Sequence, residues 1–167
     1  MDSFWKWLFS GSQNGPRGIY NIFNWWLIFH FLIGILATLF IRSDPFTFAG
    51  KALFPASSIL IGMSMAWTTR ASTILQTKDL RKKIFTESRP AEDYIYSFQL
   101  SILVIIGMVI YVAILSGGGL KISVFGNEID TFISSFFLYF VISLSLRECW
   151  GVVNFTNMLS MLEYRRK

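Results

Sequence analysis

Long apolar runs separated by short polar connections dominate the hydropathy pattern of this chain. The first run, residues 19–41, carries no formal charge apart from the titratable His30. Further runs cover about 53–69, 94–116 and 129–146. A hydrocarbon core about 30 Å thick needs roughly 20 helical residues, and a helix satisfies its own backbone hydrogen bonds in lipid. The pattern therefore predicts four membrane-spanning helices.

The second and fourth helices are predicted to continue beyond the membrane. No proline follows Arg70 or Arg147 within either segment, and apolar residues keep a helical spacing. We therefore expect helices over 53–75 and 129–150 that project further into the cytoplasm. Counted from Thr131 at 1.5 Å per residue, Arg147 lies about 24 Å into its helix. This depth predicts that both arginines mark the inner membrane interface.

Basic residues gather on one side of the predicted topology. The termini, the middle connection and the adjoining helix ends hold 12 of the 15 Lys and Arg residues. Because positively charged connections stay in the cytoplasm, both termini are predicted to be cytoplasmic. The expected fold is an all-α, integral membrane four-helix bundle, N-in/C-in, of spans 19–41, 53–75, 94–116 and 129–150. Residues 1–18 would form a cytoplasmic N-terminal segment and residues 19–167 the transmembrane domain.

An aromatic cluster opens the N-terminal segment. It consists of Phe4, Trp5, Trp7, Leu8 and Phe9, and a polar, glycine-containing linker follows it. Aromatic rings of this kind settle at the level of the lipid headgroups, which favours an interfacial anchor. A plug or lid that docks under the bundle is the alternative interpretation.

The composition argues against catalysis. Hydrophobic residues make up 53% of the 167 residues, above the 45–50% typical of soluble domains. Cys149 is the only cysteine and His30 the only histidine, so zinc sites and Ser-His-Asp triads lack their parts. No phosphate-binding, dinucleotide or metalloprotease motif occurs in the sequence. We expect no enzyme activity, no metal and no cofactor.

Polar residues form two stripes at a spacing of about four residues. The candidates are Ser135, Tyr139, Ser143 and Arg147 on the fourth helix and Ser64, Thr68 and Ser72 on the second. Such a stripe either lines a water-filled path or joins packed helices through hydrogen bonds. Four helices have too little polar surface for a conduit of their own, so a path would require a homo-oligomer.

Three ionisable residues fall within or beside the predicted spans. His30 lies near the middle of the first span, where it is either a functional residue or a neutral, hydrogen-bonded structural one. Arg70 and Glu148 are predicted at a similar depth, so a salt bridge between them is one interpretation. In the other, both arginines reach lipid phosphates and Glu148 faces cytoplasmic water.

A basic cytoplasmic face follows from the topology. Its members are Lys78, Arg81, Lys82, Lys83, Arg89, Arg165, Arg166 and Lys167. Attraction to anionic lipid accounts for such a face at about 1 kcal/mol per basic residue. The alternative is a binding site for a nucleotide, an oligonucleotide or an acidic cytoplasmic protein, which oligomerisation would multiply around an axis.

The nearest things to a signature motif in this sequence are the segments WTTRASTIL, around Arg70, and LRECWGVVNF, around Arg147. Together with the four spans and short outer loops, they resemble the small four-span subunits of bacterial antiphage defence systems, over the whole chain. The resemblance implies an oligomeric channel- or pore-type effector in the bacterial inner membrane. A cytoplasmic anionic ligand or partner would open it and depolarise the cell. A non-conducting membrane anchor for a cytoplasmic enzyme or complex is the alternative.

Overall fold

The computed structural model describes residues 4–11, 17–41, 43–75, 91–119 and 127–164, in which every regular element is helical. In chain order these elements are α1 (Phe4–Ser10), the 3-10 turn η1 (Gly18–Asn21), α2 (Trp25–Phe40), α3 (Pro45–Phe48), the π-helical segment η2 (Ala49–Leu53), α4 (Phe54–Leu75), α6 (Ala91–Ser116) and α7 (Asn127–Tyr164).

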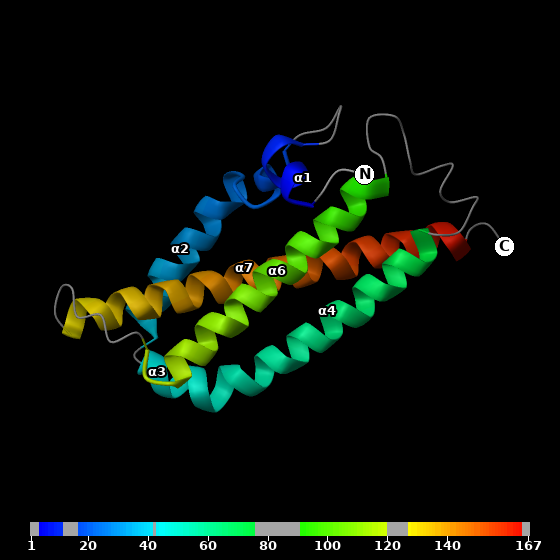
Figure 1. The fold of residues 1–167 in the computed structure, drawn as a ribbon. Helices are drawn as coiled ribbons and strands as arrows, with labels where there is room; N and C mark the ends of the chain where they lie inside the picture. The colour runs from blue at the N-terminus through cyan, green and yellow to red at the C-terminus, as the bar shows by residue number, and fades with distance from the viewer. Residues whose placement is uncertain (1–3, 12–16, 42, 76–90, 120–126, 165–167) are drawn as a thin grey trace.

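Three long helices, α4, α6 and α7, form an elongated bundle (Figure 1). Helix α2 packs chiefly against α7, whereas α4 and α6 contact both each other and α7. We call the end that holds α3 and the C-terminus of α6 the loop end. The opposite end holds α1 and the last turns of α7, and we call it the terminal end (Figure 1).

The three long helices have the length and the apolar character needed to cross a membrane. The qualifying segments are Pro45–Ile74, Asp93–Ser116 and Asp130–Met161. They overlap the predicted spans at 53–75, 94–116 and 129–150, and they are consistent with a multi-pass membrane protein. Helix α7 runs without interruption for 38 residues, so the predicted continuation of the fourth helix beyond Arg147 is confirmed.

The first predicted span is shorter than the sequence suggested. Helix α2 has 16 residues, about 24 Å at 1.5 Å per residue, against the 23 residues expected over 19–41. The Asn24 side chain accepts a hydrogen bond from the backbone N–H of Trp26 and so caps the helix at that point. The preceding residues 18–21 form the separate turn η1, and the chain bends between η1 and this cap.

The second span begins earlier than predicted. Asp44 accepts hydrogen bonds from the side chain and the backbone N–H of Thr47, and Pro45 occupies the first helical turn. The same hydrogen bonds, with that of the Thr47 side chain foremost, hold the pKa of Asp44 below its ordinary value. Through η2 the helical path then continues into α4, past Arg70 to Leu75.

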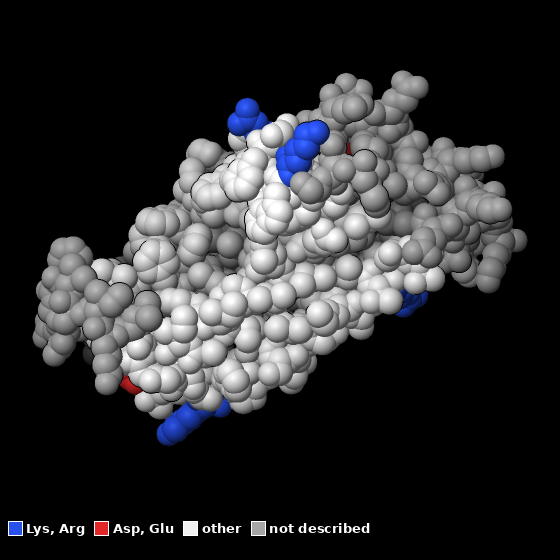
Figure 2. Space-filling model, in the orientation of Figure 1, with Lys and Arg blue, Asp and Glu red and all other residues white. Residues whose placement is uncertain are grey.

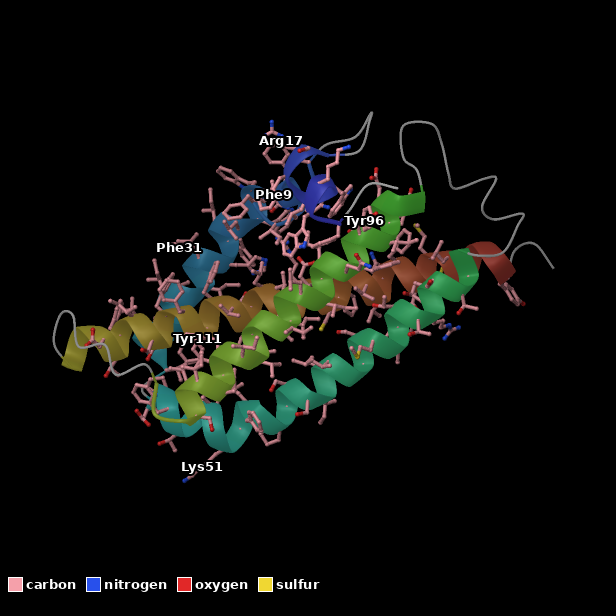
Figure 3. All side chains as sticks on the ribbon, in the orientation of Figure 1. Phe9, Arg17, Phe31, Lys51, Tyr96 and Tyr111 are labelled. Carbon is pink, nitrogen blue, oxygen red and sulfur yellow. The ribbon has the colours of Figure 1, made fainter. Side chains whose placement is uncertain are left out.

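Charge is sparse along the face shown in Figure 2. The blue atoms lie toward the rims, over α1 and near the two ends of the α4 region, and a broad uncharged band separates them (Figure 2). Lys51 marks the loop end of this face and Arg17 the region of α1 (Figure 3). This distribution fits a surface whose middle lies in hydrocarbon.

Two glycines at the end of α6 allow a test of the loop end. Gly119 has a φ of 77°, and a β-carbon there would lie 2.6 Å from the Phe46 ring. Gly119→Ala should therefore lower the free energy of unfolding in detergent micelles by about 1–2 kcal/mol. Gly117→Ala is the matched control, since its β-carbon would make ordinary contacts of 3.5 Å. Equal stabilities of the two variants would contradict the positive φ of Gly119 and its close contact with Phe46.

Candidate functional site: a polar seam between α2 and α7

The polar stripe predicted on the fourth helix faces α2 over most of its length. Ser143 Oγ lies 2.7 Å from Nδ1 of His30, whose side chain is buried. One turn toward the loop end, the hydroxyl of Tyr139 lies 3.1 Å from that of Ser43, just after α2. We call Ser43, Tyr139, His30, Ser143 and Arg147 the polar seam.

Arg147 joins the seam to the start of α2. Its Nη2 donates to the backbone carbonyl of Asn21 at 2.9 Å, and its Nη1 lies 3.4 Å from Oδ1 of Asn24. Asn24 thus caps α2 and contacts the guanidinium with the same side-chain oxygen. Three separate elements, η1, α2 and α7, meet at this one cation.

Glu148 completes the charged centre. Its Oε1 accepts hydrogen bonds from Nε and Nη2 of Arg147 at 3.0 and 2.6 Å, and its Oε2 accepts one from Ser101 of α6 at 2.7 Å. Both carboxylate oxygens are therefore engaged. The side chains of Arg147 and Glu148 retain 22% and 15% of their exposure, so the pair is largely removed from solvent.

The structure does not contain the salt bridge considered between Arg70 and Glu148. Arg70 lies over the ring of Trp67, 5.8 Å from its centroid. Ser64, not Arg70, stands opposite this part of α7, because its hydroxyl lies 3.2 Å from Sγ of Cys149. Arg70 is six residues further along α4, about 9 Å toward the terminal end. The sequence carried no information on this stagger between the helices.

The hydrogen bond from Ser101 to Glu148 fixes where the ion pair lies along α6. Ser101 lies eight residues, about 12 Å, inside Asp93, where the apolar segment of α6 begins. It lies fifteen residues, about 22 Å, from the other end of that segment at Ser116. Glu148, bonded to Ser101, therefore sits within the apolar length of α6. Counting along α7 alone could not reveal this.

Aromatic rings flank the seam and close it. Phe31 of α2 packs edge-on against Phe136, with ring centroids 4.9 Å apart, and also contacts Phe140. Gly34 permits the close approach of the two helices, since a β-carbon there would lie 3.1 Å from both Phe136 and Phe140. In the single chain the middle of the seam, at His30 and Tyr139, is thus a buried helix contact, whereas Ser43 and Arg147 at its two ends stay exposed or partly exposed.

The stripe predicted on the second helix also lies within the bundle. Ser64 is buried against Cys149, and the hydroxyl of Thr68 donates to the backbone carbonyl of Ser64. Ser72 is half-buried. The remaining stripe member, Ser135, is buried on α7. The basic residues Lys78, Arg81, Lys82, Lys83, Arg89, Arg165, Arg166 and Lys167 fall outside the described part of the chain.

The N-terminal helix docks against the terminal end of α6. The indole N–H of Trp7 donates to Oδ1 of Asp93 at 2.9 Å, and its ring packs against Tyr96 (Figure 3). A β-carbon at Gly18 would lie 2.3 Å from the same ring, so only glycine fits there. Trp5 and Phe9 remain 59% and 58% exposed. The segment therefore has one face docked against α6 and one exposed aromatic face. Docking is a feature of the plug or lid interpretation, and exposed aromatic rings are a feature of the interfacial-anchor interpretation.

Sequence reasoning missed several members of the site. Asn24 carried a usable signal, because an asparagine directly before an apolar run is a preferred helix cap. Ser101 carried none, since a lone serine in an apolar helix is compatible with any face. Ser43 lies outside the helices and Asn21 ends the short 3-10 turn η1, and only the fold brings them to Tyr139 and Arg147.

Comparisons of the whole chain with protein-family models, with curated proteins and with solved structures found no match.

The ion pair can be tested by comparing single and double variants. The singles are Arg147→Met and Glu148→Met, and each leaves one largely buried charge without its partner, so each should lower the free energy of unfolding by about 2–3 kcal/mol. Replacing both residues with methionine removes both charges and should cost less than either single change. Chemical unfolding in micelles measures both values. A double variant as unstable as the sum of its singles would contradict the coupling.

The docking of α1 can be tested at its two tryptophans. Trp7→Phe removes the hydrogen bond to Asp93 and should cost about 1 kcal/mol of docking free energy, or roughly fivefold faster amide hydrogen exchange in α1. Trp5→Phe, a change at an exposed ring, is the control and should leave exchange unaltered. If the Trp7 variant also left exchange unaltered, α1 would not be held by this contact.

Proposed function

We propose that the protein is a channel-type membrane effector that acts as a homo-oligomer and conducts along the polar seam. The observation that carries this proposal is the Arg147–Glu148 pair, which lies inside the apolar length of the bundle and forms one end of the seam. Charged residues are costly within a bilayer and, where they occur, they commonly mark ion or substrate pathways. The buried His30 extends the same line by one helical turn.

The closed seam requires a movement before it can conduct. Helix α2 is suited to move, because it packs chiefly against α7 and leaves large side chains such as Trp25 and Phe40 exposed. Separation of α2 from α7 would part Phe31 from Phe136 and expose the polar side chains between them. Helix motions of this kind, on a scale of a few ångströms, occur in many gated proteins.

A further face of α4 supports the homo-oligomer. Small or hydroxyl-bearing residues recur at helical spacing on the exposed side of this helix: Ser58, Gly62, Ala66, Thr69 and Thr73. A β-carbon at Gly62 would meet no atom within 4 Å, so the space beside it is open. Small residues at this spacing let membrane helices of separate chains approach closely. We propose this face as the contact between copies.

The trigger and the biological role are proposed from the sequence alone. A cytoplasmic polyanion or acidic partner would bind the basic face around Lys82 and Lys83 and open the path. Opening in a bacterial inner membrane would depolarise the cell, in keeping with the resemblance to antiphage defence subunits. The formal net charge of +5 favours such a ligand.

Conduction along the seam can be tested by thiol accessibility combined with recording. In a Cys149→Ser background the chain has no other cysteine. Ser143→Cys should then react with a charged, membrane-impermeant thiol reagent and reduce current through planar bilayers when a cytoplasmic polyanion is present. Leu146→Cys is the control, because its exposed side chain lies on another face of α7 and should react without changing the current.

Two results would count against the proposal. Conductance that stays at the level of protein-free bilayers, with and without polyanion, would remove the channel function. Conductance without any modification at position 143 would instead place the path elsewhere.

A membrane anchor is the second candidate. Beyond the ion pair, α7 exposes Met158, Met161 and Tyr164, the last at 80%. A hollow of about 340 Å³ lies beside Met161 and Tyr164. An exposed apolar surface on a projecting helix is suited to a protein partner. Charge reversal at Lys82 and Lys83 should then release a co-purifying partner while bilayers stay silent.

A further inference from the structure

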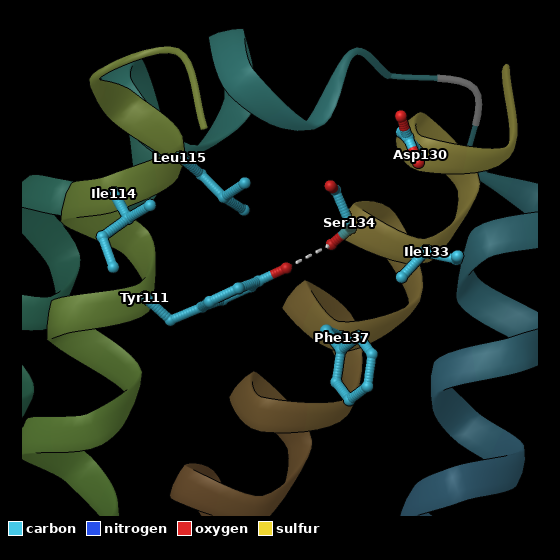
Figure 4. A pocket seen from close by; sticks show the side chains of 7 residues that line it. All are labelled: Tyr111, Ile114, Leu115, Asp130, Ile133, Ser134 and Phe137. Atoms are coloured by element: carbon cyan, nitrogen blue, oxygen red, sulfur yellow. Dashed lines mark hydrogen bonds between the residues drawn. The ribbon is translucent and has the colours of Figure 1, made fainter. Parts of the chain in front are cut away.

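A second hollow opens between α6 and α7 at the loop end, away from the seam. Its volume is about 240 Å³, and seven side chains line it: Tyr111, Ile114, Leu115, Asp130, Ile133, Ser134 and Phe137 (Figure 4). The Tyr111 hydroxyl donates to the backbone carbonyl of Ser134 at 3.1 Å and so fixes the ring across the hollow. We propose that this hollow binds an alkylammonium group.

The charge of the hollow selects a cation. Among the lining residues that the structure describes, Asp130 is the only carboxylate, and none is a lysine or arginine. Among the described residues Asp130 has no ion-pair partner. A metal ion is a poor match, because calcium takes six to eight oxygen ligands and the described residues contain no cluster of three His, Cys, Asp or Glu.

The rest of the lining selects an organic cation. The faces of the Tyr111 and Phe137 rings can attract an ammonium group, and Ile114, Leu115 and Ile133 accept an apolar chain. The hollow is smaller than the roughly 300–1,000 Å³ typical of drug-sized ligands. It therefore suits a headgroup amine with a few carbons rather than a large molecule.

The depth of these groups matches an amphipathic ligand. Asp130 stands in the first turn of α7, at the loop end, and Phe137 lies seven residues, about 10 Å, further into the bundle (Figure 4). The charged group of a ligand would meet the carboxylate at the mouth, and its carbons would lie against the rings below. Ile133 and Phe137 are 37% and 46% exposed, so a chain attached to the amine can leave sideways.

Two sources share this chemistry, a membrane aminophospholipid and a free alkylamine. Purified protein in maltoside micelles should show a higher midpoint of thermal unfolding with phosphatidylethanolamine than with phosphatidylglycerol of the same chains. Hexyltrimethylammonium, compared with hexanol, supplies the free alkylammonium ion. A response to the lipid alone assigns the site to a headgroup, and a response to hexyltrimethylammonium alone assigns it to a free ligand. Responses to both support the shared chemistry.

Matched variants locate the binding. Asp130→Asn and Tyr111→Leu should each weaken ammonium binding about five- to tenfold, measured by native mass spectrometry or by titration of the unfolding midpoint. Tyr111→Phe keeps the ring and should bind within about twofold of the parent. If Tyr111→Phe still binds, the loss of ammonium binding in Tyr111→Leu is due to the missing ring and not to misfolding.

Equal responses to the ammonium and non-ammonium probes, or unchanged binding in Asp130→Asn, would overturn the assignment. None of these measurements uses conductance, so their outcome is independent of the proposed channel function.

Discussion

The ion pair between Arg147 and Glu148 is the contact on which the arrangement of the bundle depends. Through Arg147 it holds the turn η1 and the start of α2, and through Glu148 it holds α6 by way of Ser101. Removing two charges from water costs several kcal/mol per ion, and close hydrogen bonds offset this cost only when most of the polar atoms are satisfied. The extensive bonding of this pair meets that condition.

The same contact explains why α2 is short and why the N-terminal segment folds back. The apolar helix has to begin where Asn24 can cap it beside Arg147, which leaves residues 18–21 to turn toward α1. Trp7 then packs on Gly18 and bonds to Asp93 at the end of α6. The charged centre is thereby connected with the aromatic terminal end, so a change at one is expected to alter the packing at the other.

Buried polar contacts are concentrated on α7, the helix that α2, α3, α4 and α6 all contact. Its seam faces α2, whereas Ser64 of α4 meets Cys149 and Ser101 of α6 meets Glu148. The buried hydroxyl of Ser145 and Nε2 of His30 have no hydrogen-bond partner within the described residues. Unsatisfied buried groups are uncommon in native proteins. Ser145 lies on α7 itself, and His30 lies on α2 opposite Ser143 of α7.

The sequence by itself determined the helical class and three of the long apolar segments, because uninterrupted apolar runs depend only on local order along the chain. It also identified Ser143, Arg147 and His30 as residues to examine, since polar side chains stand out in an apolar run. Only the tertiary structure decided their partners. Stagger between helices is set by how their side chains fit together, which placed Ser64 of α4, not Arg70, beside Cys149 and brought Ser101 of α6 to Glu148. No periodicity within a single helix records the offset of its neighbour.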